Sequence, residues 1–183
     1  MVKTLVSASI LAAGLLAVPA SAGVMAVGSS AARSCYEAAE FGSSDRGMDA
    51  CNRALTQDAL SERDEVATYV NRGILRIKAK DMSAAIRDFD HAIARDPDQA
   101  ESYLNKGIAL LHSANYAGSL PYFETALEKD TKKPALAHLA RGMALEMSGN
   151  VQAAYRDYKK ASLLDPKWDA PTAELARFTV NQR

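Results

Sequence analysis

The residue types that most often carry out chemistry are few in this chain, and they are scattered. The three histidines are His91, His112 and His138, and no two of them have the i, i+4 spacing that places two zinc ligands on one helix face. No serine stands in a Gly-x-Ser-x-Gly sequence, and the glycines occur singly rather than in a phosphate-binding cluster. We therefore expect no enzymatic activity, no metal and no cofactor.

The first 22 residues have the order of a secretory signal peptide. Lys3 precedes an apolar stretch at residues 5–18, and the small residues Ala20-Ser21-Ala22 follow it. We expect cleavage after Ala22 and export, as in bacterial periplasmic proteins, with no stable membrane insertion afterwards. An uncleaved membrane anchor is the alternative, because the uncharged run continues to Ala32.

The only two cysteines, Cys35 and Cys51, lie in two short sequences typical of helices, and Phe41-Gly42-Ser43-Ser44 between them has the composition of a turn. A redox-active pair would more typically be Cys-x-x-Cys, which is absent. In an oxidising compartment we expect the two cysteines to form a structural disulfide. Two buried free thiols are the alternative.

The middle of the chain repeats. Gly73, Gly107 and Gly142 are 34 and 35 residues apart, a period typical of stacked helix pairs. Asp81 fits the N-cap of a second helix in the first unit, which the sequence Asp96-Pro97 ends. Each glycine is small where two helices must approach closely, and a following aromatic residue is large enough to fill the remaining space. The other recurring residues are Tyr69, Ala85, Phe89, Ala92 and Pro97; Tyr103, Phe123 and Ala126; and His138, Ala154, Tyr158, Ala161 and Pro166.

This pattern resembles the tetratricopeptide repeat over roughly residues 66–168, although Ser119 and Thr131 depart from it in the second unit. The resemblance implies an all-α fold, a right-handed superhelical array of antiparallel helix pairs. The expected organisation is a signal peptide at 1–22, a flexible mature N-terminus at 23–32, a degenerate hairpin at 33–65, repeats at 66–99, 100–134 and 135–168, and a capping helix with its tail at 169–183.

In this family, ligand contacts commonly come from the second, fifth, sixth and ninth positions of each repeat, on the face formed by the first helices. The predicted peptide groove consists of Val70, Asn71, Ile74, Leu104, Asn105, Ile108, Leu136, Leu139 and Met143. It lacks the Lys and Arg of the family's clamp for C-terminal carboxylates. Asn71 and Asn105 instead resemble a ladder that holds an extended peptide backbone, since an amide both donates and accepts. Packing between helices is the alternative role for these residues.

The remaining side chains have structural interpretations. Asp88 is expected to point to solvent and His138 to occupy a packing position. A last helix is expected at residues 171–180, with Phe178 covering the third unit, and Trp168 is expected to pack at that junction. Residues 1–22 contain one charge, Lys3, so the remaining 161 residues have 21 Lys and Arg against 22 Asp and Glu. With no basic stripe, we expect no nucleic-acid partner.

The function that these observations favour is an exported adaptor that binds protein or peptide segments. One alternative is a structural or self-associating envelope module. Another is a noncatalytic domain that binds a small ligand or a cell-wall fragment, which would need a deeper polar pocket. The sequence leaves the oligomeric state open.

Overall fold

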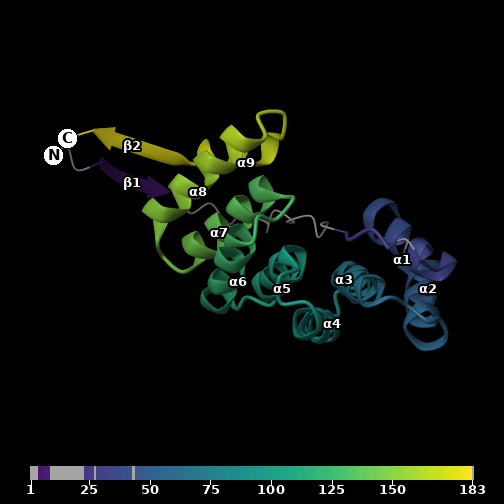
Figure 1. Cartoon of the computed structure of the whole chain (residues 1–183). Coiled ribbons are helices and arrows are strands. Elements are labelled where there is room, and N and C mark those ends of the chain that lie inside the picture. The colour runs from purple at the N-terminus through teal and green to yellow at the C-terminus, as the bar shows by residue number, and fades with distance from the viewer. Residues whose placement is uncertain (1–3, 9–22, 27, 43, 183) are drawn as a thin grey trace.

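The computed structural model of the chain describes residues 4–8, 23–26, 28–42 and 44–182. Its helices follow one another as packed pairs, which confirms the expected helical array (Figure 1). Within the described residues the helices are α1 (Ser30–Phe41), α2 (Ser44–Gln57), α3 (Glu62–Lys78), α4 (Met82–Arg95), α5 (Ala100–His112), α6 (Tyr116–Glu128), α7 (Pro134–Met147), α8 (Val151–Leu164) and α9 (Asp169–Leu175).

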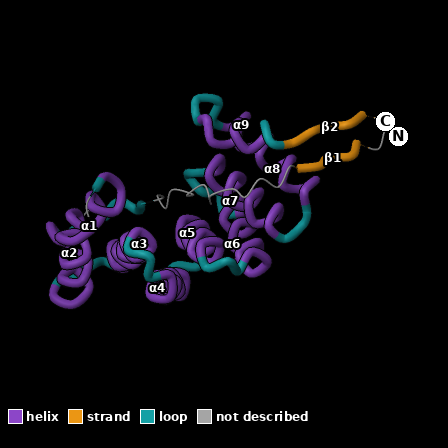
Figure 2. Tube along the Cα trace, turned by 180° about the vertical axis from the view of Figure 1, so that it is seen from behind, coloured by secondary structure: helices purple, strands orange, loops and turns teal. Residues whose placement is uncertain are grey.

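The first helices of successive pairs lie side by side. Helix α1 packs on α3, α3 on α5, and α5 on α7, while each of them also packs on its own partner, α2, α4, α6 or α8 (Figure 2). One face of the array is therefore formed by α1, α3, α5 and α7. This is the face on which the sequence placed the peptide groove.

Each repeat is closed by an aromatic ring that lies against a glycine. A Cβ atom on Gly73 would lie 2.4 Å from Cε1 of Phe89, a distance that real Cβ contacts do not reach. Phe89 is fully buried, so its ring has no room to move away. The same pairing recurs, with 2.7 Å in both cases, between Gly107 and Phe123 and between Gly142 and Tyr158.

A side-chain cap begins the second helix of each repeat. The Asp81 carboxylate accepts a hydrogen bond from the Ala84 amide at 3.0 Å, which confirms the expected N-cap. Asn115 and Asn150 do the same at the starts of α6 and α8. A short polar residue at this position thus marks each turn between paired helices.

The two ends differ from the sequence expectations. The last helix ends at Leu175, not near residue 180, and Phe178–Gln182 forms strand β2, antiparallel to β1 (Thr4–Ala8). The expected signal peptide lies outside the described residues except for residues 4–8. Helix α1 begins at Ser30, where Ser29 caps it, so part of the segment expected to be flexible is helical.

Candidate functional site

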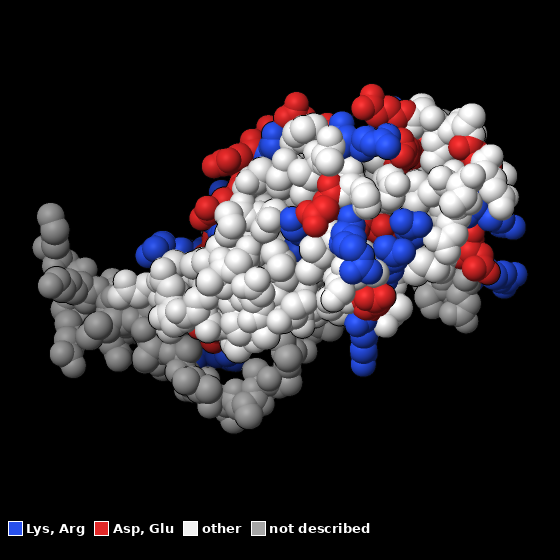
Figure 3. Space-filling view, turned by 90° about the horizontal axis from the view of Figure 1, so that it is seen from below, with Lys and Arg blue, Asp and Glu red and all other residues white. Residues whose placement is uncertain are grey.

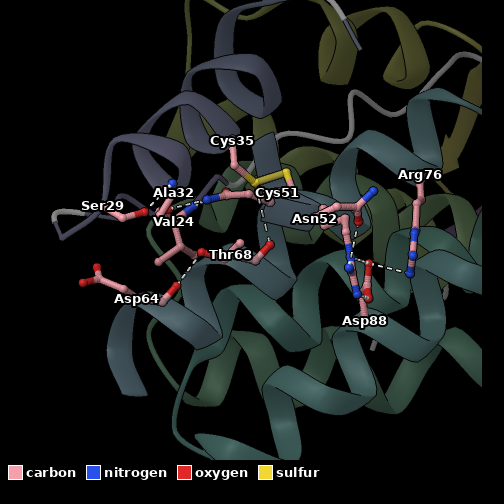
Figure 4. Close-up of a disulfide and its surroundings, with 12 residues drawn as sticks. Val24, Ser29, Ala32, Cys35, Cys51, Asn52, Asp64, Thr68, Arg76 and Asp88 are labelled. Carbon is pink, nitrogen blue, oxygen red and sulfur yellow. Dashed lines mark hydrogen bonds and ion pairs between the residues drawn. A yellow bond between two sulfur atoms is a disulfide. The ribbon is translucent and has the colours of Figure 1, made fainter. Parts of the chain in front are cut away.

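The first helix pair carries the predicted disulfide. Cys35 of α1 and Cys51 of α2 are joined, with their Cα atoms 4.8 Å apart, and both residues are fully buried (Figure 4). The bond packs against α3, where Thr68 O lies 3.9 Å from Sγ of Cys35. The disulfide thus fixes the hairpin that ends the array.

The nine predicted groove residues belong to α3, α5 and α7, three from each helix. Eight of them are buried, and Met143 is half-buried. Most of their side chains contribute to the main apolar core, while Leu139 packs with Tyr158 and Phe178 near the carboxyl end. Packing between helices is therefore part of what these residues do.

Asn71 already holds a peptide backbone. Its Oδ1 accepts a hydrogen bond from the Val24 amide at 2.9 Å, and its Nδ2 donates to the Val24 carbonyl at 2.7 Å. The residue is fully buried, so water does not compete for these two bonds. Both polar groups of one residue in the preceding segment are thus satisfied by one amide side chain.

The second asparagine, Asn105, is one repeat further along the same face. It is also fully buried, and its Nδ2 donates to the Glu101 carbonyl at 2.9 Å, one turn earlier in α5. The Glu101 carboxylate in turn accepts a bond from the Lys132 amide at 2.9 Å, which joins α5 to the start of the next repeat.

The sequence interpretation missed the contact between Glu40 and Gly23. Its Oε2 accepts a hydrogen bond from the Gly23 amide at 3.2 Å, beside the residue that Asn71 holds. A Cβ atom on Gly23 would lie 2.7 Å from that oxygen and 3.4 Å from the Tyr36 ring. The only sequence signal was the position of Gly23, directly after the expected cleavage site.

Asp88 corrects one expectation. It does not point to solvent: its side chain is 1% exposed and lies 2.8 Å from Arg72 and 2.7 Å from Arg76 (Figure 4). Arg72 also donates to Asn52 of α2 at 3.0 Å, so it links the hairpin to the first repeat. A buried carboxylate is tolerated here because two guanidinium groups compensate it.

The third repeat has the same arrangement with a different partner. Asp157 accepts hydrogen bonds from Arg141 at 2.7 and 2.8 Å and from His138 Nδ1 at 2.9 Å. Burial alone would raise the pKa of Asp157, but the bonds from Arg141 and His138 outweigh it, so the pKa lies below its ordinary value. His138 is thus partly buried and hydrogen-bonded, as its packing position indicated.

A second charged cluster closes the carboxyl end. Arg177 donates to the Glu146 carboxylate at 3.0 and 2.7 Å and also pairs with Glu174, and the Tyr158 hydroxyl donates to Glu146 at 2.8 Å. Phe178 lies edge-on to Tyr158, with ring centroids 5.8 Å apart, so it covers the third unit as predicted.

A mixed polar and apolar cavity of about 400 Å³ lies where α7 begins and α8 ends. It is lined by Lys132, Lys133, Pro134, Ala135, Leu136, Leu164, Asp165 and Trp168. Trp168 also packs against both main apolar clusters, which confirms its place at the junction. Only Leu136 of the predicted groove lines this cavity.

On the face that Figure 3 shows, Lys and Arg side chains lie next to Asp and Glu side chains. Among the described residues, no group of three or more His, Cys, Asp or Glu side chains could hold a metal ion. No helix in this part of the chain is long and apolar enough to cross a membrane.

Known proteins share both the repeat and the arrangement of its helices. The family profile of the tetratricopeptide repeat matches residues 70–134 and 113–171. No curated protein sequence matches the chain significantly.

Three solved structures illustrate the similarity of fold. The tetratricopeptide-repeat domain of Arabidopsis OM64 is 23% identical, with a TM-score of 0.61 over 64% of this chain and 96% of that one. The second such domain of human RPAP3, solved with the HSP70 peptide SGPTIEEVD, is 23% identical, with a TM-score of 0.59 over 63% and 96%. MamA from Desulfovibrio magneticus RS-1 is 19% identical, with a TM-score of 0.62 over 83% and 84%. At these identities the similarity concerns the fold alone.

Proposed function

Because the chain belongs to the tetratricopeptide-repeat family, we propose that it is an exported, noncatalytic adaptor whose first helices bind extended segments of partner proteins. Domains of this family typically mediate protein–protein or peptide binding and are usually noncatalytic. The proposal assigns the binding to the face of α3, α5 and α7.

The observation that carries this proposal is the pair of bonds between Asn71 and the backbone of Val24. An asparagine side chain can donate to a backbone carbonyl and accept from a backbone N–H of the same residue. It can therefore hold any residue of an extended chain, because it does not contact that residue's side chain. Asn105 stands at the same repeat position 34 residues later. The residue type and repeat position thus recur on α5, where Nδ2 of Asn105 donates to the Glu101 carbonyl.

The chemistry of this face favours partner segments without a terminal carboxylate. Its nine predicted positions contain seven apolar residues and two asparagines, and none is cationic. The RPAP3 domain was solved with a peptide, which shows that this fold can hold one, but that peptide is a ligand of RPAP3. For this chain we propose internal, apolar segments as ligands.

Export is supported by the disulfide, since such bonds persist in oxidising compartments. Cleavage after Ala22 would remove β1 and leave β2 without its partner strand. The proposed working form is therefore the helical array together with the segment that begins at Gly23.

Site-specific crosslinking in cells tests the binding face. A photo-reactive amino acid replaces Met143 of α7 or, as a matched control, Met82 of α4, a second helix. We expect adducts with other proteins from position 143 and not from position 82. The Asn105→Ala substitution should reduce these adducts at least fivefold while circular dichroism shows unchanged helicity.

Two results would contradict the adaptor. Adducts that contain a second copy of this chain alone would indicate self-association. Equal adduct yields from positions 143 and 82 would remove the assignment to the face of the first helices.

A further inference from the structure

The four-residue segment Gly23–Ala26, which precedes α1 in the chain, is held more firmly than a connecting segment requires. Val24 is bonded through both backbone groups to Asn71 of α3 and packs against the main apolar core. Ala26 is 1% exposed and packs with alanines of α1, α2 and α3, namely Ala32, Ala54 and Ala67. The segment thus contacts the first three helices.

A side chain on Gly23 would have to displace the Glu40 carboxylate. Besides the two contacts to Glu40 and the Tyr36 ring, a Cβ atom here would lie 3.5 Å from Oδ1 of Asn71. The Glu40 carboxylate is 3.2 Å from the Gly23 nitrogen, and it is the only carboxylate that contacts this nitrogen within the described residues. Glu37, one turn earlier in α1, is exposed.

The expected cleavage site and this site coincide. Residues 20–22 have the small side chains that a signal peptidase requires, and Gly23 is the next residue. From this coincidence we infer that Glu40, Tyr36 and Asn71 form a binding site for the new amino terminus of the processed chain. The inference rests on the export included in the proposed function.

The chemistry of processing changes the ligand of Glu40. Signal peptidase hydrolyses the amide between Ala22 and Gly23, which consumes one water and leaves a carboxylate on Ala22 and an amine on Gly23 that is protonated at neutral pH. The nitrogen that donated one neutral hydrogen bond then carries a positive charge and three hydrogens. Hydrogen bonds between charged groups are about twice as strong as neutral ones.

The groups that face this nitrogen favour the charged form. Glu40 supplies the negative charge at 3.2 Å from this nitrogen, and the Tyr36 ring and the Asn71 oxygen lie 3.4 and 3.5 Å from where a Cβ atom on Gly23 would be. One cation is nearby, because Lys78 of α3 donates to the carbonyl of Ala39, next to Glu40. This ammonium group thus bonds to a backbone carbonyl of α1.

Capture of the terminus would fix the segment on α3 and determine where a partner can bind. Ala67 and Asn71, both on the first repeat's inner face, are covered by Ala26 and Val24 of the same chain. A partner segment would then have to bind on α5 and α7 rather than on the first repeat. The captured terminus thus takes the place that a partner's backbone would otherwise occupy on the first repeat.

Limited chemical labelling of the terminal amine tests this site without any partner. The full chain is expressed in a bacterium and purified from the envelope, and its intact mass identifies the first residue. An amine-reactive reagent is then applied at pH 7, and labelling at Gly23 is compared between the wild-type chain, Glu40→Gln and the control Glu37→Gln.

We expect the mass of a chain that begins at Gly23, with Glu40→Gln labelled about tenfold faster than wild type, since one pKa unit of a bound amine corresponds to that factor. Glu37→Gln should label like wild type. Equal rates in all three chains, with Gly23 first, would overturn the binding site and leave the adaptor intact. A chain that retains residues 1–22 would overturn both the processing and the site.

Discussion

At its amino end the array is closed by a covalent bond between α1 and α2, whereas at its carboxyl end Arg177 joins Glu146 and Glu174. An end unit lacks a neighbour on one side and needs another source of stability. The disulfide depends on the redox state of the compartment and hardly on salt or pH. The charged cluster has the opposite dependence, because ion pairs are screened by salt and lost on protonation.

The largest expected effect comes from removing the disulfide between α1 and α2. Replacing Cys35 and Cys51 together with alanine should lower the free energy of unfolding by about 3 kcal/mol, the value for a loop of this length in the chain-entropy model. Urea denaturation measures the loss, and hydrogen exchange should localise it to α1 and α2.

The control for this prediction is a reducing agent. Reductant should shift the wild-type midpoint toward that of the double variant, which itself should not respond. A wild-type midpoint that is the same with and without reductant would show that the disulfide contributes nothing to stability.

The second test acts on the opposite end. Arg177→Ala leaves Glu174, whose side chain is 4% exposed, without its cation. We expect this substitution to lower the free energy of unfolding by about 2 kcal/mol. The loss is smaller than for a fully buried ion pair, because Arg177 and Glu146 are partly exposed. Thermal denaturation measures it, and high salt should reduce the difference between variant and wild type.

Two further substitutions sharpen this result. Arg177→Lys keeps the charge and loses the two-pronged geometry, so it should be intermediate. Arg156→Ala removes an exposed arginine of the neighbouring helix α8 and should change little. If Arg156→Ala and Arg177→Ala had equal effects, the cluster would not be what closes this end.

The sequence predicted the repeated part of the molecule well and its ends less well. The spacing of Gly73, Gly107 and Gly142 was sufficient because each glycine contacts an aromatic residue sixteen positions later in the same unit. Such contacts are local and recur, so a single chain shows them three times. The disulfide was predictable for a similar reason, since a short hairpin brings the two cysteines together.

The expectations that failed depended on contacts between separate elements of the chain. Asp88 looked like a surface residue by composition, and only the packing of α3 on α4 reveals that two arginines cover it. Glu40 contacts Gly23 through the fold of the segment before α1, for which the sequence offers no repeat to compare. Strand β2 stands in place of a longer last helix because it pairs with β1. The paired residues Ala8 and Phe178 are 170 positions apart in the chain.

The smallest expected effect concerns the buried carboxylates of the first and third repeats, one in each. In the first repeat Asp88 contacts two arginines, whereas in the third Asp157 contacts Arg141 and His138. Asp157→Asn keeps the shape and removes the charge, so we expect a loss of about 1 kcal/mol at pH 7, since hydrogen bonds between charged groups contribute about 1.5–3 kcal/mol and an amide keeps part of that.

The contribution of Asp157 to the free energy of unfolding depends on pH. Because the pKa of Asp157 in the folded protein is below its ordinary value of 3.8, its contribution is fully present above that value. The contribution is lost as the pH falls from 3.8 through the lower folded-state pKa, since the protonated side chain no longer attracts Arg141. The difference in unfolding free energy between wild type and Asp157→Asn should therefore shrink as the pH falls below 3.8.

Urea denaturation at three pH values measures this difference. Asp49→Asn, an exposed residue of α2, is the control and should match wild type at each pH. If the difference for Asp157 persisted at pH 3, the charge on Asp157 would not be what stabilises the third repeat.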